Sequence, residues 1–393
     1  MNKALLVTLD FPPNHGGVAA YYGNVCGHLP PDQIVVLAPD GKGSEYFDAR
    51  LNFPIIRSRA LADLVPQRGV WRRLKARCSL GSLYREICRV SRGHQISVLH
   101  IGQVFPLGKV ALALKQRQNI PYIFYAHGLD ITGPQRFRRR LFLLKKIIAG
   151  ADKIIANSYF THDELVKLGA DPKRILVVYP CPNLSGESVP DDLLAAFLAG
   201  HALTDKKILL TVGRLVKRKG HDAVIKALPA VIKRVPDVFY AIVGSGPETA
   251  ALAALVNEKK LGRYVKFFGN VPAQDLPFFY QACRAFIMPA RRLSDGDVEG
   301  FGTVYLEANA YGKPVIGGKS GGVPEAVLDG RTGLLVNPEK IEEIANAAVK
   351  LLNDSAYAQR LGLQGMDRVL EEFNWQLQAD KIKAISICQK SAS

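Results

Sequence analysis

The sequence predicts an α/β protein of two domains, each built around an open parallel sheet. Short apolar segments typical of strands alternate with helical segments along the whole chain, which is the pattern of parallel α/β layers. A length of 393 residues fits two domains. The alternation is interrupted at Pro180-Cys181-Pro182-Asn183 and in the polar stretch that follows to Asp205. We therefore expect a stiff, proline-containing domain boundary there.

Six strands are predicted on each side of this break. Those expected in the first half are residues 4–9, 34–38, 98–101, 122–126, 154–157 and 176–179. Those expected in the second half are residues 208–212, 239–243, 265–269, 285–288, 314–317 and 333–336. Helices are expected between them, and the chain after Asn337 is predicted to be helical to its end.

Composition limits the class of protein. Apolar residues make up 48% of the chain, enough for ordinary cores, and no apolar run approaches the roughly 18 residues that span a bilayer. The apolar start runs directly into Asp10 and is too short for a secretory signal, so we expect a buried first strand and a cytoplasmic protein. The six cysteines show no metal-ligand spacing, so reduced thiols are expected.

The net charge of +17 is concentrated in the first half of the chain. Residues 1–180 contain 26 Lys and Arg against 12 Asp and Glu, and the densest basic segments are 72–77 and 136–146. Basic helices with interleaved apolar residues can lie on anionic lipid, but a solvated helix face would have the same pattern. The sequence contains no pattern typical of nucleic-acid binding, so no nucleic-acid partner is expected.

Two glutamates eight positions apart form the most informative motif. Glu299 lies in a Gly-rich turn, and Glu307 lies about one turn into a helix predicted over residues 303–311 and ended by Gly312-Lys313-Pro314. The open backbone amides near Gly302 lie between the two carboxylates. This arrangement suits a ligand with a phosphate at one end and hydroxyls at two others, as in a nucleotide sugar.

A basic pair follows the first strand of the second half. Arg214 and Lys219 can neutralise a pyrophosphate at a strand end, whereas Lys217 and Arg218 are expected to be solvated. Asp295-Gly296-Asp297 has a spacing that could bind Mg²⁺, but the basic residues already supply the counter-charge, so no metal is expected. The two glutamates could also be the acid and nucleophile of a glycosidase, which would not need a pyrophosphate clamp.

Two strand ends in the first half carry further candidates. Gly16 and Gly17 precede a helix and let backbone approach a phosphate closely, although glycines needed only for a turn would look the same. The loop departs from G-x-G-x-x-G, which argues against a dinucleotide cofactor. His127 ends a strand, where a histidine is often only a packing residue.

The motif order resembles a known enzyme family. Glu299 and Glu307, followed by Gly312-Lys313-Pro314-Val315-Ile316 and Ser320-Gly321-Gly322-Val323-Pro324-Glu325, together resemble the family 4 retaining glycosyltransferases of the GT-B fold. The run 288–322 is similar to GDP-mannose-dependent mannosyltransferases of the phosphatidylinositol-mannoside type. The resemblance implies two Rossmann-like domains with parallel sheets facing across a central cleft. It implies an acceptor domain over 1–183, with the last helix, 374–393, packed back on it, and a donor domain over 184–373.

The resemblance also implies roles for individual residues. Arg214 and Lys219 match the family's R-x4-K-G and would hold the donor diphosphate, and Gly16 and Gly17 would face it from the first domain. Glu307 would bind the ribose hydroxyls.

The remaining implied roles concern the transferred sugar and the base. Glu299 would bind hydroxyls of the sugar, helped by the amides of Phe301, Gly302 and Thr303. The backbone of Val271 would read the base. His127 would face the sugar, with Asp130 as a neighbour on the acceptor side.

The predicted function is transfer of a hexose, with retention, to a hydroxyl of a glycolipid, a lipid-linked acceptor or a glycan, without metal or cofactor. His127, Arg214, Lys219 and Glu299 are the predicted catalytic residues. GDP-mannose is the favoured donor, and a UDP-hexose is the alternative. An epimerase or phosphorylase on the same fold and a non-catalytic basic binding protein remain as other classes. A peripheral position at the inner face of the membrane is expected.

Overall fold

A computed structural model describes residues 3–14, 16–65, 71–183 and 186–387 of the chain, and the side chains of residues 71–77, 386 and 387 are not among those described. It divides into two compact units, one formed by Met1–Pro180 together with the chain from Asn374 onward, and the other by Cys181–Phe373. Each unit contains one sheet in which every described strand pairing is parallel. The predicted α/β class is therefore confirmed.

The first unit has a seven-stranded sheet of order β3-β2-β1-β4-β5-β6-β7. Its strands are β1 Lys3–Val7, β2 Ile34–Pro39, β3 Ile55–Ser58, β4 Ile96–Ile101, β5 Tyr122–Ala126, β6 Lys153–Ala156 and β7 Ile175–Val177. Its helices are α1 Gly17–Gly27, α2 Ser44–Asp48, α3 Arg59–Leu64, α4 Trp71–Gly93, α5 Leu107–Gln118, α6 Leu129–Thr132, α7 Arg138–Gly150, α8 Tyr159–Lys167 and α17 Trp375–Ile387, with 3-10 turns η1 Gly133–Arg136 and η2 Pro172–Arg174.

The prediction of six strands in this half was wrong, because β3 was missed. This strand has only four residues, lies at the edge of the sheet, and its second half is the polar pair Arg57 and Ser58. Its Arg57 is bound by the Asp48 carboxylate and by the carbonyls of Pro12 and Pro39. An arginine held by local acceptors inside an edge strand gives no hydrophobic pattern to detect.

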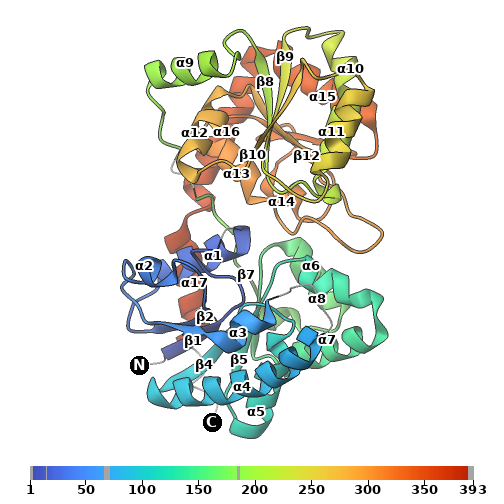
Figure 1. The fold of residues 1–393 in the computed structure, drawn as a ribbon. Coiled ribbons are helices and arrows are strands. Elements are labelled where there is room, and N and C mark those ends of the chain that lie inside the picture. Colours follow the sequence, from blue (N-terminus) through green and yellow to red (C-terminus); the bar gives the residue numbers. More distant parts are fainter. Residues whose placement is uncertain (1–2, 15, 66–70, 184–185, 388–393) are drawn as a thin grey trace. The chain divides into compact units, whose positions relative to one another are not determined.

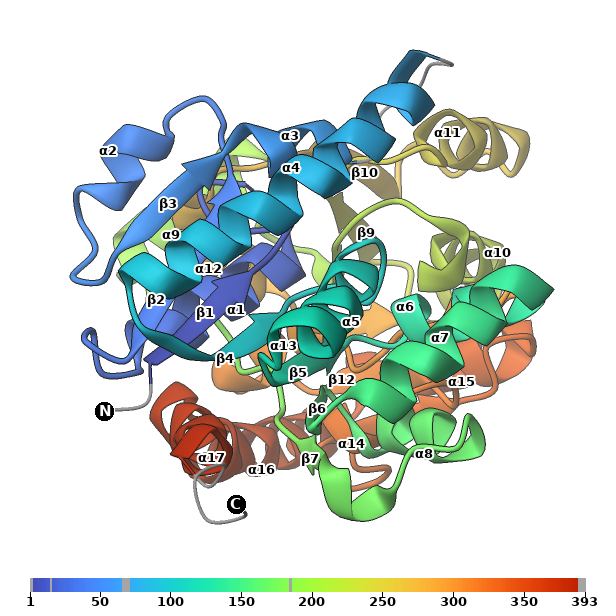
Figure 2. The ribbon, with the colours of Figure 1, turned by 90° about the horizontal axis from the view of Figure 1, so that it is seen from below.

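Helices cover both faces of the first sheet. Residues of α3, α4, α5 and α7 pack with one face in a single buried cluster, and Figure 2 shows α4, α5 and α7 crossing that face. Residues of α1 and α17 pack on the other face. The Trp375 ring lies 5.6 Å from that of Tyr21, and Gln378 Oε1 accepts a hydrogen bond from the Tyr179 amide, so α17 is part of the first unit (Figure 1).

The second unit has a six-stranded sheet of order β10-β9-β8-β11-β12-β13. Its strands are β8 Lys207–Val212, β9 Val238–Val243, β10 Val265–Gly269, β11 Ala285–Met288, β12 Val315–Gly318 and β13 Gly333–Val336. Its helices are α9 Asp191–Gly200, α10 His221–Ile232, α11 Thr249–Glu258, α12 Leu276–Ala282, α13 Thr303–Ala310, α14 Val323–Ala326, α15 Ile341–Asn353 and α16 Ser355–Glu372, with 3-10 turns η3 Lys217–Lys219 and η4 Ala273–Asp275.

All six strands predicted for this half are present, with ends shifted by a residue at several positions. The strand order reverses at β8 and β11, whose carboxyl ends open a crevice in sheets of this kind. The loops at this edge pack closely through glycines. A Cβ at Gly244, after β9, would clash with the carbonyl of Gly213, after β8, so only glycine lets these two loops meet.

Candidate active site

Glu299 is held by two cations at the carboxyl edge of the second sheet. Lys219 Nζ lies 2.6 Å from Glu299 Oε2, and Arg218 Nε lies 3.5 Å from the same oxygen. The side chains of Lys219 and Glu299 are only 9% and 12% exposed. Burial alone would raise the pKa of the Glu299 carboxyl, but the charges of Lys219 and Arg218 outweigh it and bring the pKa below its ordinary value. Glu299 is therefore a stable carboxylate at neutral pH.

Arg218 is not solvated, which corrects the sequence prediction. Its side chain is 18% exposed, and its Nη1 lies 3.4 Å from Asp297 Oδ2. The prediction failed because the run Lys217-Arg218-Lys219 forms the 3-10 turn η3, which turns Arg218 and Lys219 inward together. Asp297 is thereby paired with a cation, and Asp295 Oδ1 accepts a hydrogen bond from the Asp297 amide, so this pair of acids is engaged by the protein itself.

Glu307 has a different environment from Glu299. Tyr280, on α12, donates a hydrogen bond of 2.7 Å to Glu307 Oε2, and the Tyr280 ring stacks on Tyr311 with centroids 5.7 Å apart. Burial raises the pKa of the Glu307 carboxyl, and the Tyr280 hydrogen bond and the charge of Lys219 offset part of that rise. Sequence reasoning missed Tyr280, because the only signal for it in the sequence was its place in an aromatic run on α12.

The helix that carries Glu307 starts where it was predicted, at Thr303. Gly302 caps it with φ 97°, and no side chain caps its first turn, so amides at this end lack a side-chain acceptor. A Cβ at Gly302 would run into the ring of Tyr305, whose hydroxyl donates to the Met288 carbonyl at the end of β11. Phe301 is fully buried.

Arg214 lies at the end of β8 with its side chain exposed. Among the described residues its guanidinium has no recorded ion pair or hydrogen bond. Gly213, just before it, lies against the Lys219 stem, since a Cβ there would stand 3.8 Å from Lys219 Cε. Val271 is half-buried after β10, next to Asn270, which accepts a hydrogen bond from Ser245. Lys219, Glu299 and the start of α13 thus lie together in the structure. Among the described residues, the side chains of Arg214 and Val271 make no recorded contact with this group.

His127 directly follows β5 of the first unit and is half-buried among aromatic rings. Its Nε2 lies 2.7 Å from the Tyr22 hydroxyl, which donates its single proton to the Gly102 carbonyl. The hydroxyl must therefore accept from Nε2–H, which leaves Nδ1 of His127 as an acceptor. Burial lowers the pKa of His127 to about 4, so the imidazole is neutral at pH 7. Tyr22 was not among the predicted site residues.

Asp130 lies beside His127 and is nearly enclosed. Its Oδ1 accepts a hydrogen bond from the His127 amide at 2.9 Å, while Oδ2 is buried without a partner among the described residues. Burial raises the pKa of the Asp130 carboxyl to about 6, against several backbone hydrogen bonds that lower it. Gly16 caps α1 with φ 143°, and both Gly16 and Gly17 are exposed. These residues belong to the first unit, whereas the Glu299 and Glu307 sites belong to the second.

The predicted basic segment 136–146 begins at the end of η1 and continues into helix α7. Phe142 is 63% and Phe137 is 48% exposed. Arg136 and Arg140 lie over the Phe137 ring at 5.3 and 5.1 Å, and Lys146 lies 4.6 Å from the centre of the Phe142 ring. The other predicted basic segment, 72–77, lies outside the described side chains. No described helix is long and apolar enough to cross a membrane.

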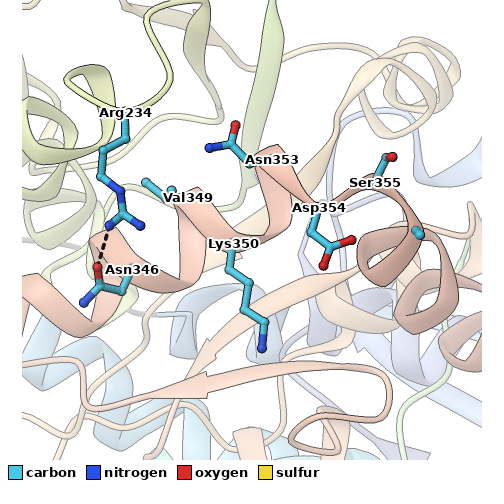
Figure 3. A pocket seen from close by; sticks show the side chains of 8 residues that line it. Arg234, Asn346, Val349, Lys350, Asn353, Asp354 and Ser355 are labelled. Atoms are coloured by element: carbon cyan, nitrogen blue, oxygen red, sulfur yellow. Dashed lines mark hydrogen bonds between the residues drawn. The ribbon is translucent and has the colours of Figure 1, made fainter.

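A separate hollow of about 670 Å³ lies where α10 ends and α15 meets α16 (Figure 3). Arg234 Nη1 donates to Asn346 Oδ1 at 2.7 Å there, and Lys350 lies over the Tyr357 ring. None of the predicted site residues lines it, and we assign it no ligand. In the parts of the chain that the structure describes, no group of three or more His, Cys, Asp and Glu side chains is arranged to hold a metal ion.

Two family models match the chain. Residues 15–185 match "Glycosyltransferase Family 4", and residues 198–368 match "Glycosyl transferases group 1". A GDP-mannose-dependent alpha-(1-6)-phosphatidylinositol monomannoside mannosyltransferase from Mycolicibacterium smegmatis is 32% identical over 96% of both chains.

Solved structures with the same fold are also found. HepE from Anabaena in complex with UDP and glucose has a TM-score of 0.80 at 20% identity and covers 98% of this chain and 99% of its own. Sucrose-phosphate synthase from Thermosynechococcus elongatus has a TM-score of 0.79 at 24% identity, with 98% of each chain covered. At these identities the similarity establishes the fold.

Proposed function

The chain belongs to family 4 of the glycosyltransferases, with two Rossmann-like domains, and we propose that it transfers mannose from GDP-mannose to a hydroxyl of a lipid-linked or glycan acceptor. The observation that carries the proposal is the pairing of Lys219 with Glu299 beside the start of α13, where no side chain caps the helix. A cation and open amides offer a place for a diphosphate, and the carboxylate next to them offers acceptors for sugar hydroxyls.

Each site residue has a role in this proposal. Lys219 and Arg214 hold the diphosphate, together with the amides of Gly302 and Thr303. Glu299, kept ionised by its cations, accepts hydrogen bonds from the hexose hydroxyls. Glu307 accepts hydrogen bonds from the ribose hydroxyls, with Tyr280 fixing its orientation.

The remaining predicted contacts stay part of the proposal. The Val271 backbone and the Phe301 amide contact the nucleotide sugar from the second unit. From the first unit, Gly16 and Gly17 face the diphosphate and His127 offers Nδ1 to a sugar hydroxyl.

We infer a retaining transfer by attack on the face that the diphosphate leaves. Glu299 is a poor nucleophile, because two cations hold its charge and lower its pKa. The acceptor oxygen forms the new bond to the anomeric carbon as the bond to the diphosphate oxygen breaks, and that oxygen takes the acceptor proton. Arg214 and Lys219 stabilise the negative charge that develops on the leaving diphosphate. No metal or cofactor has a part in this proposal.

The donor assignment rests on the relatives. The Mycolicibacterium smegmatis enzyme is GDP-mannose-dependent and is similar along nearly the whole chain, which favours GDP-mannose. The HepE structure contains UDP and glucose, which keeps a UDP-hexose as the second candidate. A nucleotide-sugar epimerase is a less favoured candidate, because no cofactor-binding fingerprint follows the first strand.

We further propose that the protein works at the inner face of the membrane. Helix α7 and the Phe137 that precedes it present exposed phenylalanines surrounded by lysines and arginines, a combination that suits the headgroup region of anionic lipid. The same relative acts on a phosphatidylinositol mannoside, which is a membrane lipid. A lipid acceptor would be reached from this position without a membrane-spanning segment.

A donor screen tests the proposal. Purified protein is incubated with GDP-mannose, UDP-glucose, UDP-galactose and UDP-GlcNAc, with and without lipid extract, and the released nucleoside diphosphate and the sugar products are measured. We expect GDP release from GDP-mannose, increased by lipid. Faster turnover of a UDP-sugar would replace the donor, conversion to an epimeric nucleotide sugar would replace the reaction, and no turnover of any donor would overturn the proposal.

A further inference from the structure

Arg218 stands between two carboxylates at the edge of the proposed donor site. Its Nη1 lies 3.4 Å from Asp297 Oδ2, and its Nε lies 3.5 Å from Glu299 Oε2. Nε is buried and makes no hydrogen bond to the residues that the structure describes. The two carboxylates therefore hold the Arg218 side chain in the site, because an unpaired buried guanidinium would be strongly disfavoured.

The four groups Lys219, Arg218, Asp297 and Glu299 form a charge cluster with no net charge when all are ionised. Lys219 is the nearer cation to Glu299, at 2.6 Å against 3.5 Å for Arg218. In the proposed function, a bound diphosphate brings negative charge to Lys219 and draws its ammonium toward the phosphates. Glu299 then needs a second cation to remain an oriented carboxylate, and Arg218 is already in place because Asp297 anchors it.

We propose that Arg218 is a positioning residue, which holds the Glu299 carboxylate toward the hexose while Lys219 engages the donor diphosphate. This inference rests on the donor roles proposed above for Lys219 and Glu299. It adds to them a residue that lies outside the R-x4-K-G motif. Arg218 itself contacts neither the diphosphate nor the hexose and acts only through Glu299.

The other groups that face Glu299 cannot take over this task. Tyr305, on α13, lies within the electrostatic influence of Glu299 but is neutral, and it donates its hydroxyl to the Met288 carbonyl. Asp297, in the same loop, is an anion that binds Arg218. Without Arg218, Lys219 would be the single cation in contact with Glu299 among the described residues.

The test compares Arg218→Met and Arg218→Lys with Glu299→Gln and with the double variant R218M/E299Q. Lys217→Met is the matched control, since it removes the same charge from the exposed neighbouring residue of η3. Two quantities are measured: kcat and KM for the nucleotide sugar that the wild type turns over, and the Kd of the matching nucleoside diphosphate, which lacks the hexose.

For R218M we expect kcat/KM for the nucleotide sugar to fall about tenfold, the scale of one lost charge-assisted contact. The Kd of the nucleoside diphosphate should change less than about twofold, because Arg218 acts on the hexose through Glu299. R218K should restore most of the loss. The double variant should be no worse than E299Q alone, since both changes remove the same interaction. The acid limb of kcat/KM in R218M should move to higher pH, because one of the two charges that lower the Glu299 pKa is gone.

Several results would overturn the inference. The inference fails if R218M behaves like K217M, if R218M weakens binding of the nucleoside diphosphate as much as that of the nucleotide sugar, or if its loss adds to that of E299Q. A wild type that turns over no nucleotide sugar overturns the proposed function and this inference with it. An active wild type with an R218M variant indistinguishable from K217M overturns the inference alone.

Discussion

The Tyr22 hydroxyl lies 2.7 Å from Nε2 of His127 and donates its proton to the Gly102 carbonyl. This relationship fixes which ring nitrogen of His127 carries the proton, and so it fixes the acceptor that the imidazole offers to a ligand. The rings of Tyr21 and Tyr22 pack edge to face with the His127 ring, with centroids 5.4 and 5.6 Å away, and fix the plane of the imidazole. A neutral, oriented histidine at a strand end is suited to binding a hydroxyl rather than to transferring a proton at pH 7.

Tyr22→Phe should therefore impair the proposed sugar contact of His127. The change leaves Nε2–H buried without an acceptor, which costs about 1–3 kcal/mol of stability or shifts the ring to the other tautomer. We expect a lower melting temperature and a several-fold rise in KM for the nucleotide sugar. The ¹⁵N shifts of the His127 ring report the tautomer directly. Tyr46→Phe, at a tyrosine that is 70% exposed, is the control; an unchanged ring spectrum in Y22F would contradict the assignment.

The Asp130 carboxyl should make stability depend on pH. Because its folded-state pKa is about 6, above the ordinary 3.8, the folded protein binds this proton more tightly than the unfolded chain. The contribution is fully present below about pH 4 and is lost as the pH rises through 6. Asp130→Asn removes it and keeps an oxygen for the His127 amide.

We expect D130N to gain stability relative to wild type between pH 4 and pH 7, by up to about 3 kcal/mol, and to keep a constant difference above that range. The pKa of His127, about 4, is common to both proteins and cancels in the difference. Thermal unfolding of wild type and D130N at pH 4.5, 6 and 8 measures the difference in stability between them. A difference that does not change with pH would show that Asp130 does not titrate in this range.

Glu307 and Tyr280 allow a test of the ribose contact. Glu307→Gln should raise KM for the donor about tenfold, and Tyr280→Phe should raise it less, because Tyr280 only orients the carboxylate. The decisive comparison uses GDP-mannose and its 2′-deoxyribose analogue. Wild type should prefer the ribose form, and E307Q should lose most of that preference. Equal preference in wild type and E307Q would remove Glu307 from the ribose site, and Tyr357→Phe serves as the control.

The sequence predicted what depends on local pattern and missed what depends on packing. The parallel sheets and the start of α13 at Thr303 follow from apolar periodicity and from the Gly302 cap. Arg218 was misjudged because a run of three basic residues suggests solvent, and only the turn η3 directs two of them inward.

Tyr22 and Tyr280 were missed for a related reason. Each contacts a predicted site residue from another element, 105 positions away for Tyr22 and His127 and 27 for Tyr280 and Glu307. No spacing rule along the chain relates such pairs. Their aromatic character predicts burial, and the hydrogen bonds follow only from the way the helices pack on the strands.

Helix α7 should determine membrane association. Phe142→Ser removes the exposed aromatic residue of α7, which is more exposed than Phe137 at the start of the helix, and we expect flotation with liposomes that contain anionic phospholipid to fall several-fold. Binding to neutral liposomes should be weak for both proteins, and added salt should reduce binding of the wild type. Tyr46→Ser, at an exposed aromatic residue of α2, is the matched control. Equal flotation of wild type and F142S would exclude α7 as the contact.

Arg214 should contribute to turnover without contributing to stability. Its guanidinium is exposed and has no recorded partner among the described residues, so Arg214→Ala leaves no buried group unpaired. If Arg214 stabilises the leaving diphosphate, R214A should lower kcat on the order of a hundredfold, as expected for loss of one group that stabilises charge in the transition state. Arg263→Ala, at another exposed arginine of the same unit, should leave both kcat and the melting temperature unchanged. A normal kcat in R214A would show that Arg214 does not stabilise the leaving diphosphate. Lys219 and the α13 amides would then be the groups left in that role.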